Sequence, residues 1–216
     1  MTKQTKKGLF RYFSMDCARM IYLALIPCFR LRCLGTDGRK KPSKVKGGAI
    51  IAANHTGFID PFVLSTLFWR RRLFLLTAKE VMATKVREFW LTRAGCIKID
   101  RSISDMVAIR QCVTVLKAGK LLGMFPEGHI QRDGDMDSVK SGAVLISLQA
   151  DVPVIPFYSQ KPSRWWHRRR VIMGEPIHMK EICGKRFPSV ADIEQLSTLL
   201  QTKMEECKST YEQTNF

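Results

Sequence analysis

Two residue types suited to acid–base chemistry lie five positions apart in the chain, a histidine at position 55 and an aspartate at position 60. A carboxylate that accepts a hydrogen bond from one imidazole nitrogen fixes the tautomer of the ring and leaves the other nitrogen to act as a base. His55 and Asp60 therefore form the orienting half of a catalytic triad, without its serine. The alternative is that Asp60 only caps a helix and His55 only occupies a turn, since Asp-Pro is common after turns.

The elements that would position this pair can be inferred from the neighbouring residues. Residues 50–53 form a short apolar run that is typical of a strand buried on both faces. Gly57 permits a tight turn, and Asp60 followed by Pro61 predicts the start of a helix, where the missing proline N–H is harmless. The sequence thus places the imidazole at the end of a strand and the carboxylate at the start of a helix.

Two further groups of polar residues follow predicted strands. Arg101 ends the segment 95–101, at the carboxyl end of a strand, where α/β sheets usually bind ligands; a solvated loop arginine is the alternative. Glu127 and Gly128 follow another apolar strand, and Arg132 comes four residues after Gly128. A carboxylate, a flexible glycine and a cation in one place suit a substrate that carries hydroxyls and a phosphate.

Apolar strand-like runs alternate with helical patterns over most of the chain, which predicts an α/β fold with a mixed, mostly parallel sheet and flanking helices. Strands are predicted near residues 49–53, 73–77, 96–99, 121–125, 154–158 and 171–173. Helices are predicted near residues 61–69, 85–93, 104–118, 141–150 and 189–207.

Basic residues greatly outnumber acidic ones. With 36 Lys and Arg against 19 Asp and Glu, the formal net charge of +17 predicts a polyanionic partner such as nucleic acid, an anionic membrane or a phosphorylated substrate.

The 7 cysteines are odd in number and include no Cys-x-x-Cys pair, which favours reduced thiols in a cytosolic setting. The 4 histidines show no ligand spacing, so no metal is expected.

The pattern of residues 9–34 predicts an amphipathic helix in which a few arginines are interspersed among aromatic and aliphatic side chains. Its uninterrupted apolar part, residues 20–29, is about half as long as the ~20 residues needed to cross a bilayer. We therefore predict a membrane-docking segment with a linker at residues 1–46, and a catalytic domain at 47–216, with the protein peripheral or monotopic on the cytoplasmic face of the cell membrane. A helix packed on the core of the domain is the alternative.

Residues 161–170 combine Lys and Arg with Trp165 and Trp166 and contain no acid. This composition suits a membrane interface, and it suits a single-stranded nucleic-acid site equally well.

Four blocks occur in order along the chain: Asn54-His55 with Asp60, residues 95–101, Phe125-Pro126-Glu127-Gly128, and residues 152–157. This set resembles the glycerolipid acyltransferases, and among them the bacterial 1-acylglycerol-3-phosphate acyltransferases, over roughly residues 45–175. The resemblance implies a dyad of His55 and Asp60, and contacts to the substrate phosphate from Arg101 and the third block. The residues we expect to bind substrate are Asn54, Arg101, Glu127, Gly128 and Arg132. It also implies an acyl thioester donor, acyl-CoA or acyl-acyl carrier protein, with no cofactor.

The chain departs from the family pattern at two places. The third block usually reads Glu-Gly-Thr-Arg, whereas His129 and Ile130 follow Gly128 here, so that Arg132 is the candidate for the missing phosphate-binding arginine. The first block often has serine where this chain has Gly57, which leaves both dyad members intact.

The implied reaction is direct acyl transfer to the free hydroxyl of lysophosphatidate, which yields phosphatidate for phospholipid biosynthesis. His55 would remove the hydroxyl proton and Asp60 would stabilise the imidazolium that forms. The alternatives are another lysophospholipid or glycerol-3-phosphate as acceptor, or a non-enzymatic protein that binds anionic lipid or nucleic acid. Binding driven by charge alone explains neither the His-x-x-x-x-Asp spacing nor the ordered blocks, so we expect an anionic membrane surface as partner and no nucleic acid.

Overall fold

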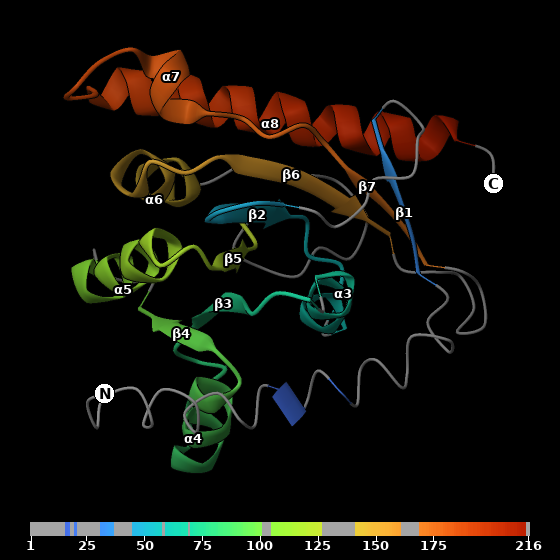
Figure 1. Cartoon of the computed structure of the whole chain (residues 1–216), viewed down its shortest axis with the longest axis vertical. Coiled ribbons are helices and arrows are strands. Elements are labelled where there is room, and N and C mark those ends of the chain that lie inside the picture. The colour runs from blue at the N-terminus through green and yellow to red at the C-terminus, as the bar shows by residue number, and fades with distance from the viewer. Residues whose placement is uncertain are drawn as a thin grey trace.

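The computed structural model describes residues 16–17, 20, 31–36, 45–57, 59–68, 70–100, 105–126, 141–160 and 169–214 (Figure 1). These form a seven-stranded sheet in the order β1-β7-β6-β2-β5-β3-β4. All neighbouring strands are parallel except β6 and β7, which are antiparallel. The strands are β1 (Arg32–Gly35), β2 (Ala49–Ala53), β3 (Leu73–Ala78), β4 (Cys96–Ile99), β5 (Leu121–Met124), β6 (Val154–Ser159) and β7 (Arg170–Met173).

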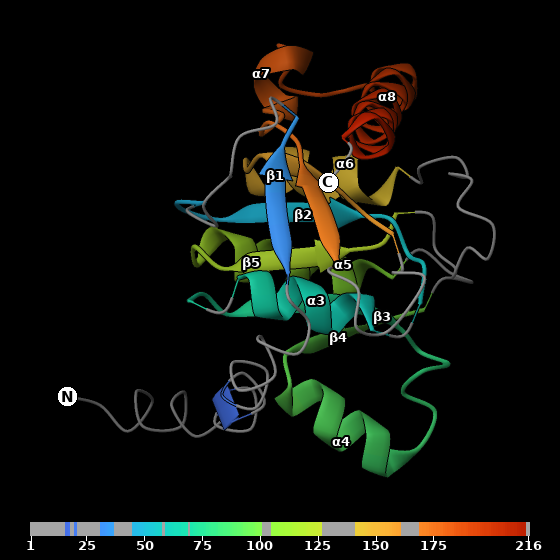
Figure 2. The ribbon, with the colours of Figure 1, turned by 90° about the vertical axis from the view of Figure 1, so that its right-hand side faces the viewer.

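Helices cover both faces of this sheet (Figure 2). The helices are α3 (Asp60–Leu67), α4 (Lys85–Arg93), α5 (Met106–Lys117), α6 (Gly142–Ala150), α7 (Met179–Cys183) and α8 (Val190–Gln213). Side chains of α3 pack on one face together with Ile51 and Ala53, whereas α5, α6, α7 and α8 pack on the other face together with Ile50 and Ala52. Successive side chains of a strand point to opposite faces, so β2 contributes to both cores and is buried throughout.

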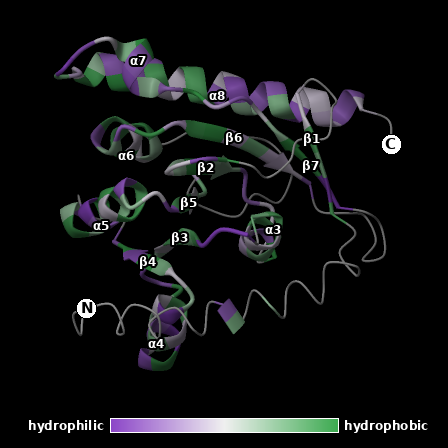
Figure 3. Ribbon diagram, viewed as in Figure 1, coloured by the Kyte–Doolittle hydropathy of each residue, from purple (hydrophilic) through white to green (hydrophobic). Residues whose placement is uncertain are grey.

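The predicted α/β fold with a mixed, mostly parallel sheet is confirmed. Each predicted strand is present within one residue of its expected bounds. Helix α8 continues to Gln213, six residues beyond its predicted end, and it begins with a reciprocal capping box between Ser189 and Asp192. Figure 3 shows the first part of β6 in green, the hydrophobic colour, and the rest of the strand paler, whereas α8 alternates between hydrophobic and hydrophilic residues as a helix on the surface of a core does.

The prediction of a helix up to residue 34 is wrong at its C-terminal end. Residues 32–35 form β1, which pairs in parallel with β7, and Leu34 is buried against Ile172, Tyr158 and Cys207. The four residues carry no periodic pattern of their own, so their conformation is set by pairing with a strand far along the chain. β1 precedes the predicted boundary at residue 46, so the sheet includes residues from both predicted segments.

Residues 16, 17 and 20 are helical, and most of the predicted docking segment lies outside the described residues. In the described part of the chain, no helix combines the length and the hydropathy that crossing a bilayer requires.

Candidate active site

The candidate site lies where three neighbouring parallel strands end. β2 is flanked by β5 and β6, so the residues that follow these strands meet at one edge of the sheet. His55 follows β2 by two residues, and its ring stacks on that of Phe125, which follows β5 directly, with ring centroids 4.3 Å apart and planes at 24°. The catalytic histidine proposed from the sequence is thus held on one side by an aromatic ring.

His55 and Asp60 are in contact, as predicted from their spacing. The Nδ1 atom of His55 lies 3.1 Å from Oδ2 of Asp60, and the side chains are 17% and 6% exposed, respectively. Because Nδ1 faces the carboxylate, the ring donates from Nδ1 when neutral, and Nε2 is then the nitrogen that can accept a proton. The pair has the geometry of a histidine base oriented by a buried carboxylate.

The carboxylate of Asp60 does not cap helix α3. The helix begins at Asp60 as predicted, but Ile59 occupies the N-cap position and no side-chain cap is formed there. Oδ2 of Asp60 instead accepts hydrogen bonds from the backbone N–H groups of Thr56 and Gly57, at 2.6 and 2.7 Å. The interpretation of Asp60 as a helix cap is therefore wrong, because its carboxylate turns back toward the loop that carries His55.

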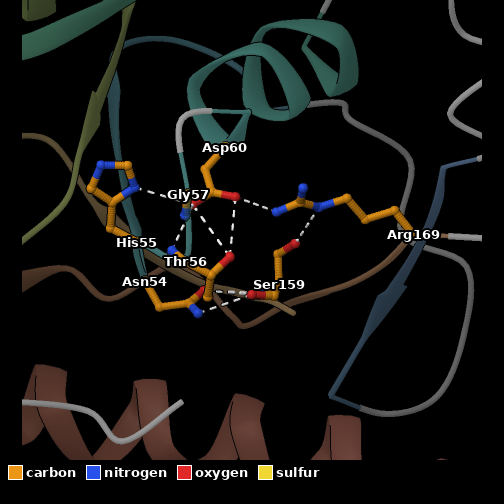
Figure 4. Close-up of polar contacts among 7 residues, drawn as sticks. All are labelled: Asn54, His55, Thr56, Gly57, Asp60, Ser159 and Arg169. Atoms are coloured by element: carbon orange, nitrogen blue, oxygen red, sulfur yellow. Dashed lines mark hydrogen bonds and ion pairs between the residues drawn. The ribbon is translucent and has the colours of Figure 1, made fainter. Parts of the chain in front are cut away.

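A residue that the sequence analysis missed completes the surroundings of Asp60 (Figure 4). Arg169, immediately before β7, forms an ion pair through Nη2 with Oδ1 of Asp60, and its Nε donates to Oγ of Ser159 at 3.0 Å. Arg169 belongs to the basic stretch 161–170, whose composition predicts a binding surface, but its side chain is only 5% exposed. The short connection between β6 and β7 was the available signal, because it favours an antiparallel pair and so places residue 169 beside the end of β6.

Asn54 joins the ends of β2 and β6. Its Nδ2 donates to the carbonyl of Ser159 at 2.9 Å, and its Oδ1 accepts from the N–H of Ser159 at 2.8 Å. Both residues are buried. Asn54 therefore holds the backbone of Ser159 in register beside His55; the substrate contact that we expect for Asn54 stays a prediction.

The electrostatics of the site favour an ionised Asp60. Burial by itself would raise the pKa of this carboxyl, but the hydrogen bond from His55, the charge of Arg169 and the N–H groups of Gly57 and Thr56 together lower the pKa below its ordinary value. The carboxylate is therefore negative at any pH at which His55 can act as a base.

Other candidate site residues, namely Arg101, Glu127, Gly128 and Arg132, lie outside the described residues, as does most of the stretch 161–170. Among the residues that the structure places, no three His, Cys, Asp or Glu side chains are grouped so that they could hold a metal ion.

A histidine oriented by a buried carboxylate, at the carboxyl edge of a central strand in an α/β sheet, is an arrangement suited to general-base catalysis. A family model described as "Acyltransferase" matches residues 35–160, which include His55 and Asp60. The chain belongs to this acyltransferase family.

Curated proteins that are similar in sequence to this chain are also named as acyltransferases. A 1-acyl-sn-glycerol-3-phosphate acyltransferase from Bacillus subtilis (strain 168) is 25% identical over 171 residues, which cover 77% of this chain and 84% of that protein. A 1-acyl-sn-glycerol-3-phosphate acyltransferase from Streptococcus pneumoniae (strain ATCC BAA-255 / R6) is 29% identical over 139 residues, which cover 62% of this chain and 51% of that protein.

The fold is also found in a solved structure. The crystal structure of the 1-acyl-sn-glycerophosphate (LPA) acyltransferase PlsC from Thermotoga maritima matches with a TM-score of 0.64 and 15% sequence identity. The match covers 100% of this chain and 86% of that one. At this identity the likeness shows a common fold.

Proposed function

We propose that this protein is a 1-acyl-sn-glycerol-3-phosphate O-acyltransferase, which transfers an acyl group from a thioester to the free hydroxyl of lysophosphatidate and yields phosphatidate. The observation that carries the proposal is the contact of 3.1 Å between Nδ1 of His55 and Oδ2 of Asp60 within the segment matched by the acyltransferase family. The names of the Bacillus and Streptococcus relatives support lysophosphatidate as the acceptor.

The reaction begins with proton transfer to His55. Nε2 takes the proton of the acceptor hydroxyl while the oxygen attacks the thioester carbonyl, and Asp60 stabilises the imidazolium. When the tetrahedral intermediate collapses, the C–S bond breaks and the imidazolium returns its proton to the departing thiolate. The products are the ester and the free thiol of coenzyme A or acyl carrier protein. General-base assistance of this kind is typically worth about 10²- to 10⁴-fold in rate.

The phosphate of the acceptor needs cations near the dyad. We assign this role to Arg101 and Arg132, with Glu127, Gly128 and Asn54 as further contacts to the glycerol headgroup. Charge-assisted hydrogen bonds from arginine to phosphate are short and roughly twice as strong as neutral ones, which suits a substrate that carries one phosphate.

The substrate and product also require a route to the membrane. A two-chained product loses ~0.8 kcal/mol for each CH₂ that it exposes to water, so a site that opens at the bilayer is favoured. Ile59 and Phe62, on either side of Asp60 and Pro61, are 46% and 44% exposed, which offers apolar contacts beside the dyad. We propose that residues 9–31 hold the enzyme at the cytoplasmic leaflet, with the basic residues of that segment facing anionic lipid.

The experiment that tests the proposal is an acylation assay of the purified protein in mixed micelles. Lysophosphatidate, other lysophospholipids and glycerol-3-phosphate are each offered with acyl-CoA or with acyl-acyl carrier protein, and the products are identified by mass spectrometry. We expect phosphatidate from lysophosphatidate and none with the His55→Ala variant. Faster turnover of a different lysophospholipid would assign that lipid as the acceptor, whereas no product from any combination would refute the acyltransferase proposal.

A further inference from the structure

We propose that Arg169 is a positioning residue of the dyad, which holds Asp60 in place beside His55 and compensates the charge of the buried carboxylate. The inference rests on the proposed acyltransferase function. It concerns a residue beyond the segment 35–160 that the family model matches.

The two oxygens of the Asp60 carboxylate have different partners (Figure 4). Oδ2 accepts from the backbone of Thr56 and Gly57 and lies 3.1 Å from Nδ1 of His55. Oδ1 pairs with Arg169 and is also 3.3 Å from Oγ1 of Thr56. Arg169 thus fixes the oxygen that does not face the histidine, which prevents rotation of the carboxylate and keeps Oδ2 directed at Nδ1.

Arg169 also compensates the charge of Asp60. A buried carboxylate needs a cation nearby, and without Arg169 the nearest group able to supply one is His55 itself. A histidine that carries the compensating proton in the resting enzyme is an imidazolium and has no lone pair with which to remove a proton from a hydroxyl. Because Arg169 supplies the positive charge, His55 does not have to.

Arg169 is itself held from two directions. Its Nε donates to Oγ of Ser159 at 3.0 Å, and its carbonyl accepts from the N–H of Arg32 in β1 at 3.0 Å. Ser159 is in turn paired through its backbone with Asn54, which precedes His55. A chain of contacts therefore runs from Asn54 through Ser159, Arg169 and Asp60 to His55, and returns to Asn54 through the peptide bond.

The test compares Arg169→Met, which removes the charge while retaining an apolar side chain, with Arg169→Lys, which retains the charge without the planar fork. Arg170→Met serves as the matched control, because it removes the neighbouring positive charge at a residue outside the contacts of Asp60. Circular dichroism and thermal unfolding establish which variants are folded. The kcat, the KM for lysophosphatidate and the pH dependence of kcat/KM are then measured for each.

We expect Arg169→Met to lower kcat at pH 7 at least tenfold, with KM for the acceptor changed less than threefold. The acid limb of its pH–rate profile should move to higher pH, because an Asp60 charge that is no longer shared retains the proton on His55. Asp60 remains ionised in this variant, since three hydrogen bonds to Oδ2 persist. Arg169→Lys should fall between wild type and Arg169→Met, and Arg170→Met should match wild type.

A folded Arg169→Met protein with the kcat and the pH profile of wild type would overturn the proposal. If Arg169→Met does not fold, the kcat values of Ser159→Ala and Arg169→Lys test the positioning role of Arg169. Loss of the Ser159 hydroxyl frees the guanidinium without changing any charge, so kcat should fall several-fold. Wild-type kcat in both of these variants would likewise overturn the proposal.

A measurement that requires no substrate separates this proposal from the proposed function. The midpoint of the His55 titration, followed by NMR of ¹⁵N-labelled histidine, should lie at higher pH in Arg169→Met than in wild type, and an unchanged or lower midpoint would contradict the positioning role. Absence of acyl transfer by wild type would refute the acyltransferase function while leaving this result interpretable.

Discussion

Replacement of Asp60 by asparagine should affect both turnover and stability, and the structure separates the two effects. Asparagine retains the shape of the side chain but removes the charge, so that Arg169, whose side chain is 5% exposed, becomes a buried cation without a counter-charge. Breaking a buried ion pair in this way costs about 3 to 5 kcal/mol. For a chain of this length such a loss lowers the melting temperature by roughly 6 to 20 °C.

Turnover should fall by about 10²- to 10⁴-fold in Asp60→Asn, because the imidazolium loses its counter-charge and the tautomer of His55 loses its acceptor. The double variant Asp60→Asn/Arg169→Met removes both charges. It should therefore regain a large part of the lost stability while its turnover stays as low as that of Asp60→Asn.

Urea unfolding of the wild type, both single variants and the double variant gives the coupling energy between residues 60 and 169. We expect a coupling well above 1 kcal/mol, because the two side chains are in direct contact and almost entirely buried. Strictly additive effects on stability would show that residues 60 and 169 are not coupled, and would refute a stabilising ion pair between them.

Four further outcomes are expected. His55→Ala should reduce turnover more than Asp60→Asn while leaving thermal unfolding near that of wild type, since its ring is on the partly exposed side of the pair; a loss of stability as large as that of Asp60→Asn would contradict this. Ionised Asp60 contributes stability that is fully present above its unfolded pKa of 3.8 and should be lost as the pH falls through its lower pKa in the folded protein. Urea unfolding of wild type and of Asp60→Asn, compared between pH 3 and pH 7, measures this contribution. Gly57→Ser should change unfolding free energy by about 0.5 kcal/mol or less, because a Cβ there has no atom within 4 Å. Arg132→Ala should raise the KM for lysophosphatidate with little change in kcat, and an unchanged KM would remove Arg132 from the phosphate site.

The test of membrane docking follows from the position of β1. A truncation to residue 34 would remove Leu34, which is 5% exposed and packs on Ile172 and Tyr158, and would therefore damage the sheet. Deletion of residues 1–30 leaves the strand intact. It should reduce vesicle flotation and activity on bilayer-embedded acceptor much more than activity on a short-chain acceptor, and equal flotation with the full-length chain would exclude the segment as an anchor.

The dyad could be predicted from the sequence because it is local. His55 and Asp60 are five residues apart, and the apolar run before them and the Asp-Pro after them indicate a strand and a helix with a short loop between. Geometry of this kind depends on backbone preferences that act over a few residues. The strands were predictable for a related reason, since buried parallel strands appear as continuous apolar runs.

Arg169 and β1 could not be predicted in the same way because both depend on distant pairing. Arg169 is 109 positions from Asp60, and in the sequence it is one of several basic residues in a polar stretch. Its burial results from the antiparallel turn of β7 against β6, which brings the residue to the edge of the sheet where His55 lies. β1 is four residues long at the edge of the sheet, where pairing with β7 decides the conformation.

The candidate site combines a pair that is local in the sequence, His55 and Asp60, with a distant residue, Arg169. The local pair places a carboxylate oxygen 3.1 Å from an imidazole nitrogen, which is the arrangement of a histidine base and its orienting group. The distant Arg169 supplies the positive charge that faces the buried carboxylate from the side away from the imidazole. Since that arginine is anchored through Ser159 and β1, the orientation of Asp60 depends on the assembly of the antiparallel end of the sheet, and we expect a change in that region to alter catalysis without touching the dyad.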